Sequence, residues 1–87
     1  DSFLINSSNQ KKIYVTEKEF EIIKLFFKNK IIRKDFIQEN ILNLQKTVDT
    51  KSLDSHLTRI RNKFLAIESG INIVSVKNES LEIKKLV

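Results

Sequence analysis

The spacing of apolar residues near the two ends of the chain predicts two β-hairpins. Residues 3–5 and 13–15 are β-forming, and the polar residues 6–9 between them favour a turn. Near the other end, the β-forming runs 71–76 and 81–83 flank a second polar turn. We therefore expect strands at both ends of the chain and a different structure between them.

Between the hairpins, apolar residues repeat at helical spacing in three segments. Thr16 and Glu19 fit a capping box at the start of the first helix, which fades near residues 29–30. Its apolar residues recur at i, i+3 and i+7, with two more beside them. The face that we expect this helix to bury consists of Phe20, Ile22, Ile23, Phe26 and Phe27.

The other two helices follow a short apolar strand at residues 31–32. The second helix is expected at about residues 34–42 and the third at about residues 52–67, with a loop at residues 43–50 between them. Gly70 stands where a helix C-cap or a turn is expected. The residues that we expect the second helix to bury are Phe36, Ile37 and Ile41.

The third helix has two opposite faces when residues 51–64 are placed on a wheel at about 100° per residue. One face is an apolar stripe that we expect in the core: Leu53, Leu57, Ile60 and Phe64. The opposite face is polar and consists of Lys51, Ser55, Thr58, Arg59 and Asn62, with Ser52 beside them. The edges between the two faces carry His56 and Lys63 on one side, and Asp54 and Arg61 on the other.

The polar face has the chemistry that a DNA major groove requires. Arg59 can form two parallel hydrogen bonds with guanine, and Ser55 is small enough to allow close approach to base edges. Ser52 and the free N–H groups of the first turn can hold a phosphate. The side chains that can reach phosphates on the groove walls are Lys51, His56 and Arg61. The alternative is an ordinary amphipathic helix with a solvated charged face.

The composition indicates one basic domain. The 87 residues carry 16 Lys and Arg against 11 Asp and Glu, a net charge of +5 that suits a polyanionic partner. The absence of cysteine excludes disulfides and thiolate metal sites, and we expect no metal and no cofactor. The chain has no proline, repeat or biased linker, so residues 1–87 are predicted to form a single domain.

The sequence lacks signals for membrane insertion, export and catalysis. No apolar run approaches the ~20 residues of a membrane-spanning helix, and no signal peptide is recognisable, so we expect a cytoplasmic protein. The chain contains no methionine, even at position 1, and we expect it to be a piece of a longer protein. Asp54, Ser55 and His56 are hydrolase residue types, but neighbours on one helix point about 100° apart and cannot form a relay. We therefore do not expect an enzyme.

Residues 51–64 resemble the recognition-helix signature of the OmpR/PhoB family, the winged helix-turn-helix output domains of bacterial response regulators in two-component systems. That signature reads Arg, Thr, Val, Asp, any, His, Ile, Ser, Arg, Leu, Arg, any, Lys, Leu. Residues 15–20 resemble the start of the family's first helix, and residues 73–83 resemble its closing wing. The resemblance covers about residues 13–83 and implies an α+β fold with an N-terminal hairpin, a three-helix core and a C-terminal hairpin wing.

The resemblance implies sequence-selective binding of double-stranded DNA for transcription regulation. The recognition helix, about residues 52–67, would lie in the major groove, and the hairpin 73–83 would be the wing. Lys77 would enter or skirt the minor groove. On the helix, the residues near bases would be Ser55 and Arg59, those at base edges or phosphates Ser52 and Thr58, and those holding phosphates Lys51, His56 and Arg61.

The resemblance also implies partners beyond DNA. In the family, the loop that corresponds to residues 43–50 can touch RNA polymerase. A phosphorylated receiver domain outside this chain would control activity, which makes residues 1–87 the C-terminal piece of a longer regulator. Tandem binding as a dimer on direct repeats is the further expectation.

Several positions depart from the family pattern, mostly in the wing. Asn78 and Ser80 replace its two glycines, Leu81 replaces its tyrosine, and Glu79 adds a negative charge near the expected path of the phosphates. Asparagine tolerates the left-handed backbone of a turn, whereas serine at position 80 tolerates it less well. Lys51 replaces the first arginine of the signature and loses its bidentate geometry. The four departures in the hairpin favour a weak wing contact with DNA, whereas the departure at Lys51 concerns the recognition helix.

Each proposed contact has an alternative. A winged-helix module can be repurposed for protein–protein interaction, with weak or no DNA binding. His56 can cap or pack at the helix edge, and Lys77 can be a solvated turn residue. Arg61 can pair with Asp54 or with a glutamate of the first helix. These alternatives stay open until the side chains are placed.

Overall fold

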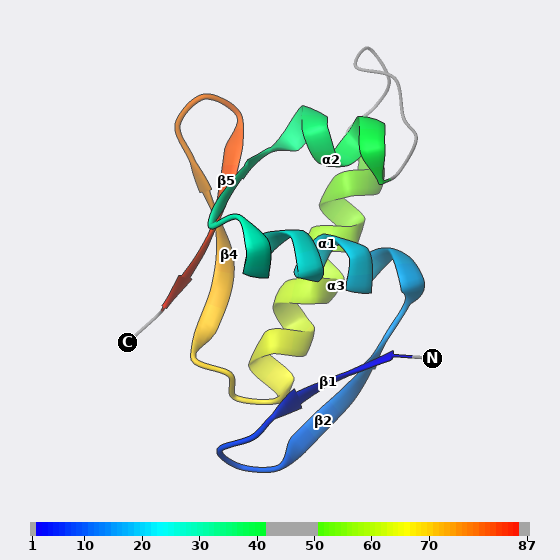
Figure 1. The fold of residues 1–87 in the computed structure, drawn as a ribbon, viewed down its shortest axis with the longest axis vertical. Helices are drawn as coiled ribbons and strands as arrows, with labels where there is room; N and C mark the ends of the chain where they lie inside the picture. The colour runs from blue at the N-terminus through cyan, green and yellow to red at the C-terminus, as the bar shows by residue number, and fades with distance from the viewer. Residues whose placement is uncertain (1, 42–50, 86–87) are drawn as a thin grey trace.

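The computed structural model describes residues 2–41 and 51–85, with side chains described from Leu53 onward in the second range. A hairpin at the N-terminal end is followed by three helices and a closing hairpin, with a short strand between the first two helices (Figure 1). This order confirms the predicted α+β winged helix-turn-helix fold. The elements are β1 (Ser2–Asn6), β2 (Lys11–Val15), α1 (Glu17–Lys28), β3 (Ile31–Arg33), α2 (Lys34–Asn40), α3 (Lys51–Ala66), β4 (Ile71–Val76) and β5 (Ser80–Lys85).

The strands form two separate antiparallel sheets. β1 and β2 pair only with each other in the described part of the chain, and their register places Phe3 opposite Tyr14. β3, β5 and β4 form a three-stranded sheet with β5 in the middle, so the closing hairpin gains β3 as a third strand. Ile73 and Leu81 of this sheet are buried in the core beneath the helices.

One hydrophobic core joins the helices to both sheets. The apolar stripe predicted on α3 is buried along its whole length. Each large apolar side chain moved from water into such a core contributes about 1.5–3 kcal/mol to stability. The core consists of Val15, Ile22, Ile23, Phe26, Ile32, Ile37, Ile41, Leu53, Leu57, Ile60, Phe64, Ile73 and Leu81.

α1 buries a different face from the one that its apolar spacing predicts. Its three middle apolar residues are buried as expected, but Phe20 and Phe27 are 39% and 64% exposed. The reason is that Glu19 points into the core and is 0% exposed, which places Phe20 and Phe27 about 100° from the middle of the buried arc. The prediction that these two phenylalanines are core residues was therefore wrong.

The predicted capping box at the start of α1 is confirmed. Thr16 Oγ1 accepts a hydrogen bond from the backbone N–H of Glu19 at 3.2 Å, and Glu19 Oε1 accepts one from the backbone N–H of Thr16 at 2.8 Å. Both bonds satisfy donors at a helix start that have no partner within the helix.

α2 lies within its predicted range but buries Gln38 in place of Phe36. Ile37 and Ile41 are in the core, whereas Phe36 is 46% exposed. Gln38 is 4% exposed, and residues two apart lie about 200° apart around a helix, so burying Gln38 turns Phe36 outward. The predicted loop at residues 43–50 lies outside the described residues.

The C-terminal end of α3 is closed by a left-handed residue. Glu68 has a φ of 50°, and the N–H groups of Glu68 and Ser69 donate to the carbonyl oxygens of Leu65 at 3.0 Å and Phe64 at 3.1 Å. This is the hydrogen-bond pattern of a Schellman motif. Gly70, with a φ of 74°, lies two residues further on, so it serves the turn into β4 and is not the residue that ends the helix.

The N-terminal hairpin completes this cap. Asn6 Nδ2 donates to the carbonyl oxygens of Ile67 and Glu68 at 2.9 and 3.0 Å, and Asn9 Nδ2 donates to that of Ile67 at 3.1 Å. Lys11 forms an ion pair with Glu68. The turn of the hairpin thereby satisfies carbonyl groups that a helix end leaves free, and it fixes the two-stranded sheet to α3.

Candidate nucleic-acid interface

The outward side of α3 is the surface with DNA-binding chemistry. Ser55, Thr58, Arg59 and Asn62 are exposed, opposite the buried apolar stripe of the same helix. Asp54, Ser55, Thr58 and Arg59 line a shallow depression there. The geometric expectation that Ser55 and Arg59 point away from the core is therefore met.

The other predicted contact residues are distributed over two elements. α3 begins at Lys51, but the side chains of Lys51 and Ser52 lie outside the described part of the structure. His56 is half-buried at the edge of the outward side, and Lys77 is exposed in the turn between β4 and β5. The structure thus brings Ser55, Thr58 and Arg59 onto one continuous surface, with Lys77 on the hairpin.

Arg61 has a structural contact that the sequence did not indicate. Its Nε donates to the carbonyl oxygen of Ile73 in β4 at 2.8 Å, and its side chain is half-buried. Among the described residues it pairs neither with Asp54 nor with a glutamate of α1, so the ion-pair alternative was wrong. The hydrogen bond fixes α3 to the first strand of the closing hairpin and sets their relative position.

Lys63 forms the ion pair that links α3 to α1. Its ammonium group contacts the carboxylate of Glu19, and the two side chains are 19% and 0% exposed. Lys63 Nζ also lies 5.8 Å from the centre of the Tyr14 ring. The start of α1, the last turn of α3 and β2 therefore meet at one buried charge pair.

The ion pair determines the protonation state of Glu19. Burial raises the pKa of the Glu19 carboxyl, but the hydrogen bonds and positive charge that it receives from Lys63 and Thr16 outweigh this effect. The pKa therefore lies below its ordinary value of 4.5, and Glu19 is ionised at neutral pH.

The sequence indicated Glu19 as a cap but not as the partner of Lys63. The available signal was the position of Lys63 at the edge of the apolar stripe of α3, where a long side chain can reach along the core toward a neighbouring helix. Which helix supplies the acid depends on how the helices pack, and the helical wheel contains no such information.

The turn of the closing hairpin contains two consecutive left-handed residues. Asn78 and Glu79 have φ values of 63° and 55°. The expectation for Asn78 is confirmed, whereas the expectation that Ser80 is strained was wrong, because Ser80 is a buried strand residue paired with Val76. The register of β4 and β5 moves the second left-handed position to Glu79, a residue type that disfavours it.

This turn is held by the segment that joins β3 to α2. The carbonyl oxygen of Glu79 accepts a hydrogen bond from the backbone N–H of Lys34 at 2.9 Å, and that of Asn78 accepts one from Arg33 Nη1 at 3.3 Å. Lys77 stands exposed next to these fixed residues. Hydrogen bonds therefore position the tip of the hairpin, although Asn78 and Ser80 stand where the OmpR/PhoB pattern has glycines.

The described residues contain neither a helix that could span a membrane nor a group of side chains that could hold a metal ion. Across residues 2–41 and 51–85, no helix has both the length and the apolar character that crossing a bilayer requires. The same residues contain no group of three or more His, Cys, Asp or Glu side chains placed to hold a metal ion.

Residues 10–79 match the protein family described as "Transcriptional regulatory protein, C terminal". The match begins in the turn of the first hairpin and ends in the turn of the last, so it includes α1, α2 and α3. Among curated proteins, none matches the chain.

Proposed function

Because the chain belongs to the OmpR/PhoB-type C-terminal DNA-binding domains of transcriptional regulatory proteins, we propose that it binds double-stranded DNA sequence-selectively. In this proposal α3 lies in the major groove and residues 73–83 of the β4–β5 hairpin form the wing. By binding DNA in this way, the protein would regulate transcription.

The exposed side of α3 carries the proposal. Arg59 has the length and the planar guanidinium to form two hydrogen bonds with guanine O6 and N7. Ser55 and Thr58 beside it are small and polar, so the helix can approach the base edges closely. The packed core behind the helix fixes the backbone positions from which these side chains project, which sequence reading requires.

Contacts with phosphates would hold the helix in register on both sides of the groove. Lys51, Ser52 and His56 are proposed for one group of phosphates, with the N–H groups of the first turn. Arg61 donates one N–H to Ile73, and its guanidinium has further donors for a phosphate. Lys77 is proposed to lie at or in the minor groove.

Selection from a random duplex library tests sequence selectivity. We expect one enriched motif with a guanine at a fixed position, since a bidentate arginine contributes about 1–3 kcal/mol of discrimination. The selected duplex should bind with steep salt dependence. If about four to six phosphates are neutralised, the slope of log affinity against log salt is about −4 to −5.

The result that would overturn the proposal is binding without selection. If no motif is enriched, and if duplex DNA at moderate salt leaves the NMR signals of residues 51–62 unchanged, the module does not read DNA through α3. That outcome favours the alternative function, a winged-helix module that contacts another protein.

Three partner assignments complete the proposal. Residues 43–50 are proposed to contact RNA polymerase, although they lie outside the described residues. A receiver domain outside this chain would supply the regulatory input, with residues 1–87 as the C-terminal unit of the regulator. Two copies would bind direct repeats in tandem about one helical turn apart.

A further inference from the structure

A second exposed surface lies on α1, on the side facing away from α3. Glu17, Glu21, Lys24 and Lys28 fall within about 60° of one another on the helical wheel. The two acids occupy the first half of the helix and the two lysines the second half. None of the four forms an ion pair with another described residue. We call these four residues the charged stripe of α1.

Two phenylalanines lie along one edge of the charged stripe. Phe20 and Phe27 are the side chains whose burial the sequence predicted and the structure does not show. Lys24 Nζ lies 6.0 Å from the centre of the Phe20 ring. The helix dipole accounts for acids at the beginning and lysines at the end of a helix, but it gives no reason for two phenylalanines in water. The two phenylalanines lie on one side of the helix about 10.5 Å apart and add apolar area to the charged stripe, and apolar area on a surface favours an interaction site where it is continuous.

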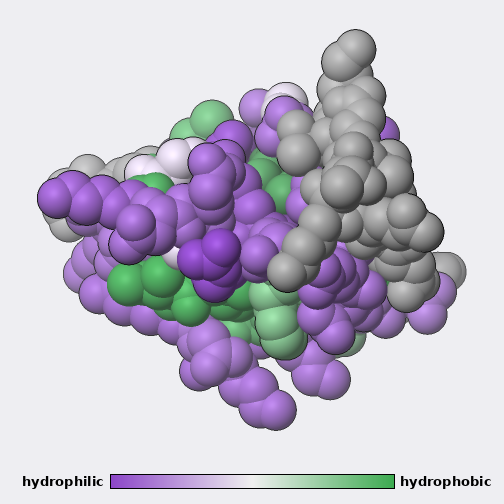
Figure 2. Space-filling view, turned by 90° about the horizontal axis from the view of Figure 1, so that it is seen from above, coloured by the Kyte–Doolittle hydropathy of each residue, from purple (hydrophilic) through white to green (hydrophobic). Residues whose placement is uncertain are grey.

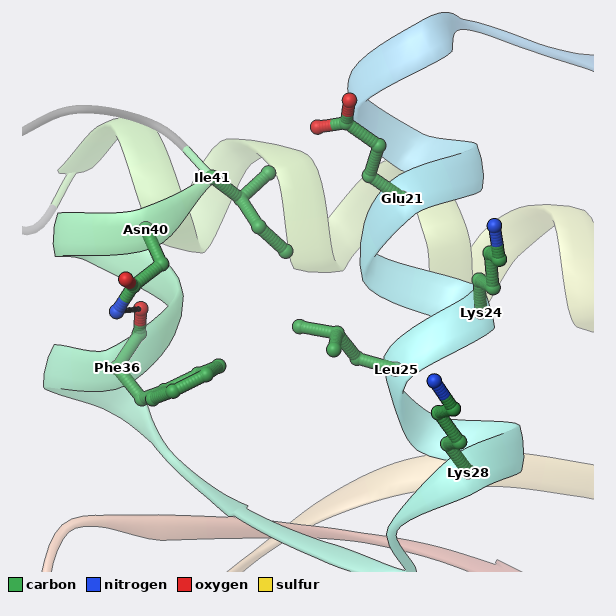
Figure 3. Close-up of a pocket in the computed structure, with 7 residues that line it drawn as sticks. All are labelled: Glu21, Lys24, Leu25, Lys28, Phe36, Asn40 and Ile41. Atoms are coloured by element: carbon green, nitrogen blue, oxygen red, sulfur yellow. Dashed lines mark hydrogen bonds between the residues drawn. The ribbon is translucent and has the colours of Figure 1, made fainter.

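A cleft between α1 and α2 borders the other edge of the stripe. Leu25, Phe36 and Ile41 point into it from the two helices, and Glu21 and both lysines of the stripe stand on its α1 side (Figure 3). Viewed from the end that carries α2, apolar side chains reach the surface between hydrophilic ones (Figure 2). The stripe is therefore flanked by apolar surface on both sides.

We propose that this face of α1 binds a second copy of the chain, with the two α1 helices antiparallel about a twofold axis. Glu17 and Glu21 of each copy then lie opposite the lysines of the other copy. Phe20 of one copy lies opposite Phe27 of the other, and the two clefts face each other. Every charge on the stripe gains a partner, and the phenylalanines are removed from water.

The order of charges selects both the partner and its direction. A parallel pair of α1 helices places acids against acids and lysines against lysines, which is unfavourable. A different protein would need an apolar face with acidic and basic halves in matching order. A second copy has that order by symmetry, because the two sides of a twofold interface are the same surface.

The proposed pairing leaves the outward side of α3 free. α1 crosses α3 (Figure 1), and both helices bury their apolar sides in one core, so the charged stripe of α1 and the outward side of α3 lie on different faces of the domain. The recognition surfaces of the pair would face away from each other and could hold two separate duplexes. This differs from tandem binding on one duplex, and it does not depend on whether α3 reads DNA.

The contact would be weak. One helix face with its flanks buries less than the about 1,200–2,000 Å² of a stable protein–protein interface. We expect a dissociation constant of about 100 μM, low enough for detection at high concentration in the absence of other contacts. Because exposed charges contribute, salt should weaken the pairing.

Sedimentation equilibrium of charge-reversed variants tests the pairing. Lys24→Glu with Lys28→Glu makes the stripe wholly acidic, and Glu17→Lys with Glu21→Lys makes it wholly basic. We expect the unaltered chain to dimerise at about 50 mM salt, each double variant to be monomeric, and an equal mixture of the two to dimerise more tightly than the unaltered chain. The control, Lys84→Glu with Lys85→Glu on β5, changes the net charge equally and should dimerise like the unaltered chain.

Disulfide trapping tests the direction of the helices, and the absence of native cysteine makes it specific. Residues seven apart on a helix are separated by about 10.5 Å, too far for a disulfide between identical positions of the antiparallel pair. A mixture of Phe20→Cys and Phe27→Cys chains should therefore form a crosslinked dimer on oxidation, whereas either chain alone should not. A monomeric unaltered chain, charge-reversed variants that dimerise normally, or equal crosslinking of each chain alone would overturn the proposal.

Discussion

The exposed faces of α3 and α1 are both polar helix surfaces over the same core, yet they differ in content. The outward side of α3 carries small polar residues and a long arginine, at Ser55, Thr58, Arg59 and Asn62, and the exposed Leu65 lies beyond them in the last turn. The outward side of α1 has acids and bases in separate halves and two exposed phenylalanines. One face suits the hydrated, uniformly negative surface of a nucleic acid, and the other suits a protein surface with both charges and apolar groups.

This difference shows that amphipathic pattern alone does not define a binding face. Both helices have an apolar side and a charged side, and a helical wheel describes the two in the same terms. The two helices differ in which of their apolar residues lie outside the core. α3 buries its whole stripe and leaves Leu65 exposed in its last turn, whereas α1 gives one core position to Glu19 and leaves Phe20 and Phe27 in solvent beside its charged residues.

The largest expected effect comes from the ion pair that supports both faces. Glu19→Ala removes a capping-box partner and the charge that Lys63 contacts. Because Lys63 is 19% exposed and can turn toward water, we expect a loss of about 2–3 kcal/mol in the free energy of unfolding, less than for a fully buried pair. Urea unfolding measures this loss.

As the control, Glu17→Ala removes an exposed acid from the same turn and should change stability by under about 0.5 kcal/mol. Equal unfolding midpoints for the two variants would show that the ion pair does not join the helices energetically.

The next largest effect separates the two faces. Arg59→Ala should weaken binding to the selected duplex by about 1–3 kcal/mol and relax the preference at one base pair. Phe20→Ser with Phe27→Ser on α1 should leave DNA affinity unchanged and abolish the proposed self-association. Fluorescence anisotropy with matched and mismatched duplexes measures the first effect. If Arg59→Ala binds all duplexes as well as the unaltered chain does, the docking of α3 is wrong.

A smaller effect follows from acid titration of Glu19. Its pKa in the folded chain lies below the ordinary 4.5, so between these two values the unfolded state binds more protons than the folded state. The stabilisation is complete above about pH 5 and is lost as the pH falls through the folded pKa. Unfolding free energies measured from pH 6 to pH 3 should therefore fall more steeply for the unaltered chain than for Glu19→Gln, which keeps the shape but cannot ionise. If the unfolding free energies of the two chains fall equally with pH, Glu19 does not cause the pH dependence of stability.

The smallest effect concerns the wing beside α3. Glu79→Gly removes the strain of a left-handed backbone at a non-glycine residue, which stabilises the folded state by about 1 kcal/mol. Glycine also makes the unfolded chain more flexible, which stabilises the unfolded state by about 0.4–1 kcal/mol. The net gain in stability should be at most about 0.6 kcal/mol. Glu79→Gln keeps the backbone conformation and should leave stability unchanged. Both variants remove a negative charge, so both should bind DNA a few times more tightly at low salt. Unchanged affinity in both would place the turn away from the phosphates.

Local patterns were sufficient wherever a feature depends on nearby residues. The capping box at Thr16, the apolar stripe of α3 and the two hairpins were all predictable, because spacing along the chain fixes which groups meet within one helix or one turn. The string at residues 51–64 likewise indicated the family that the match over residues 10–79 shows.

Tertiary packing decided the features that depend on residues far apart in the sequence. It rotated α1 so that Glu19 meets Lys63, gave Arg61 a carbonyl oxygen in β4, and used Asn6 and Asn9 to cap a helix about sixty residues later. It also fixed the left-handed turn at Glu79, whose carbonyl oxygen accepts a hydrogen bond from the backbone N–H of Lys34. The sequence by itself determined the elements and their likeness to a family. Only the folded chain decided which face of each helix the core covers, since that choice depends on the combined shape of all the elements packed together.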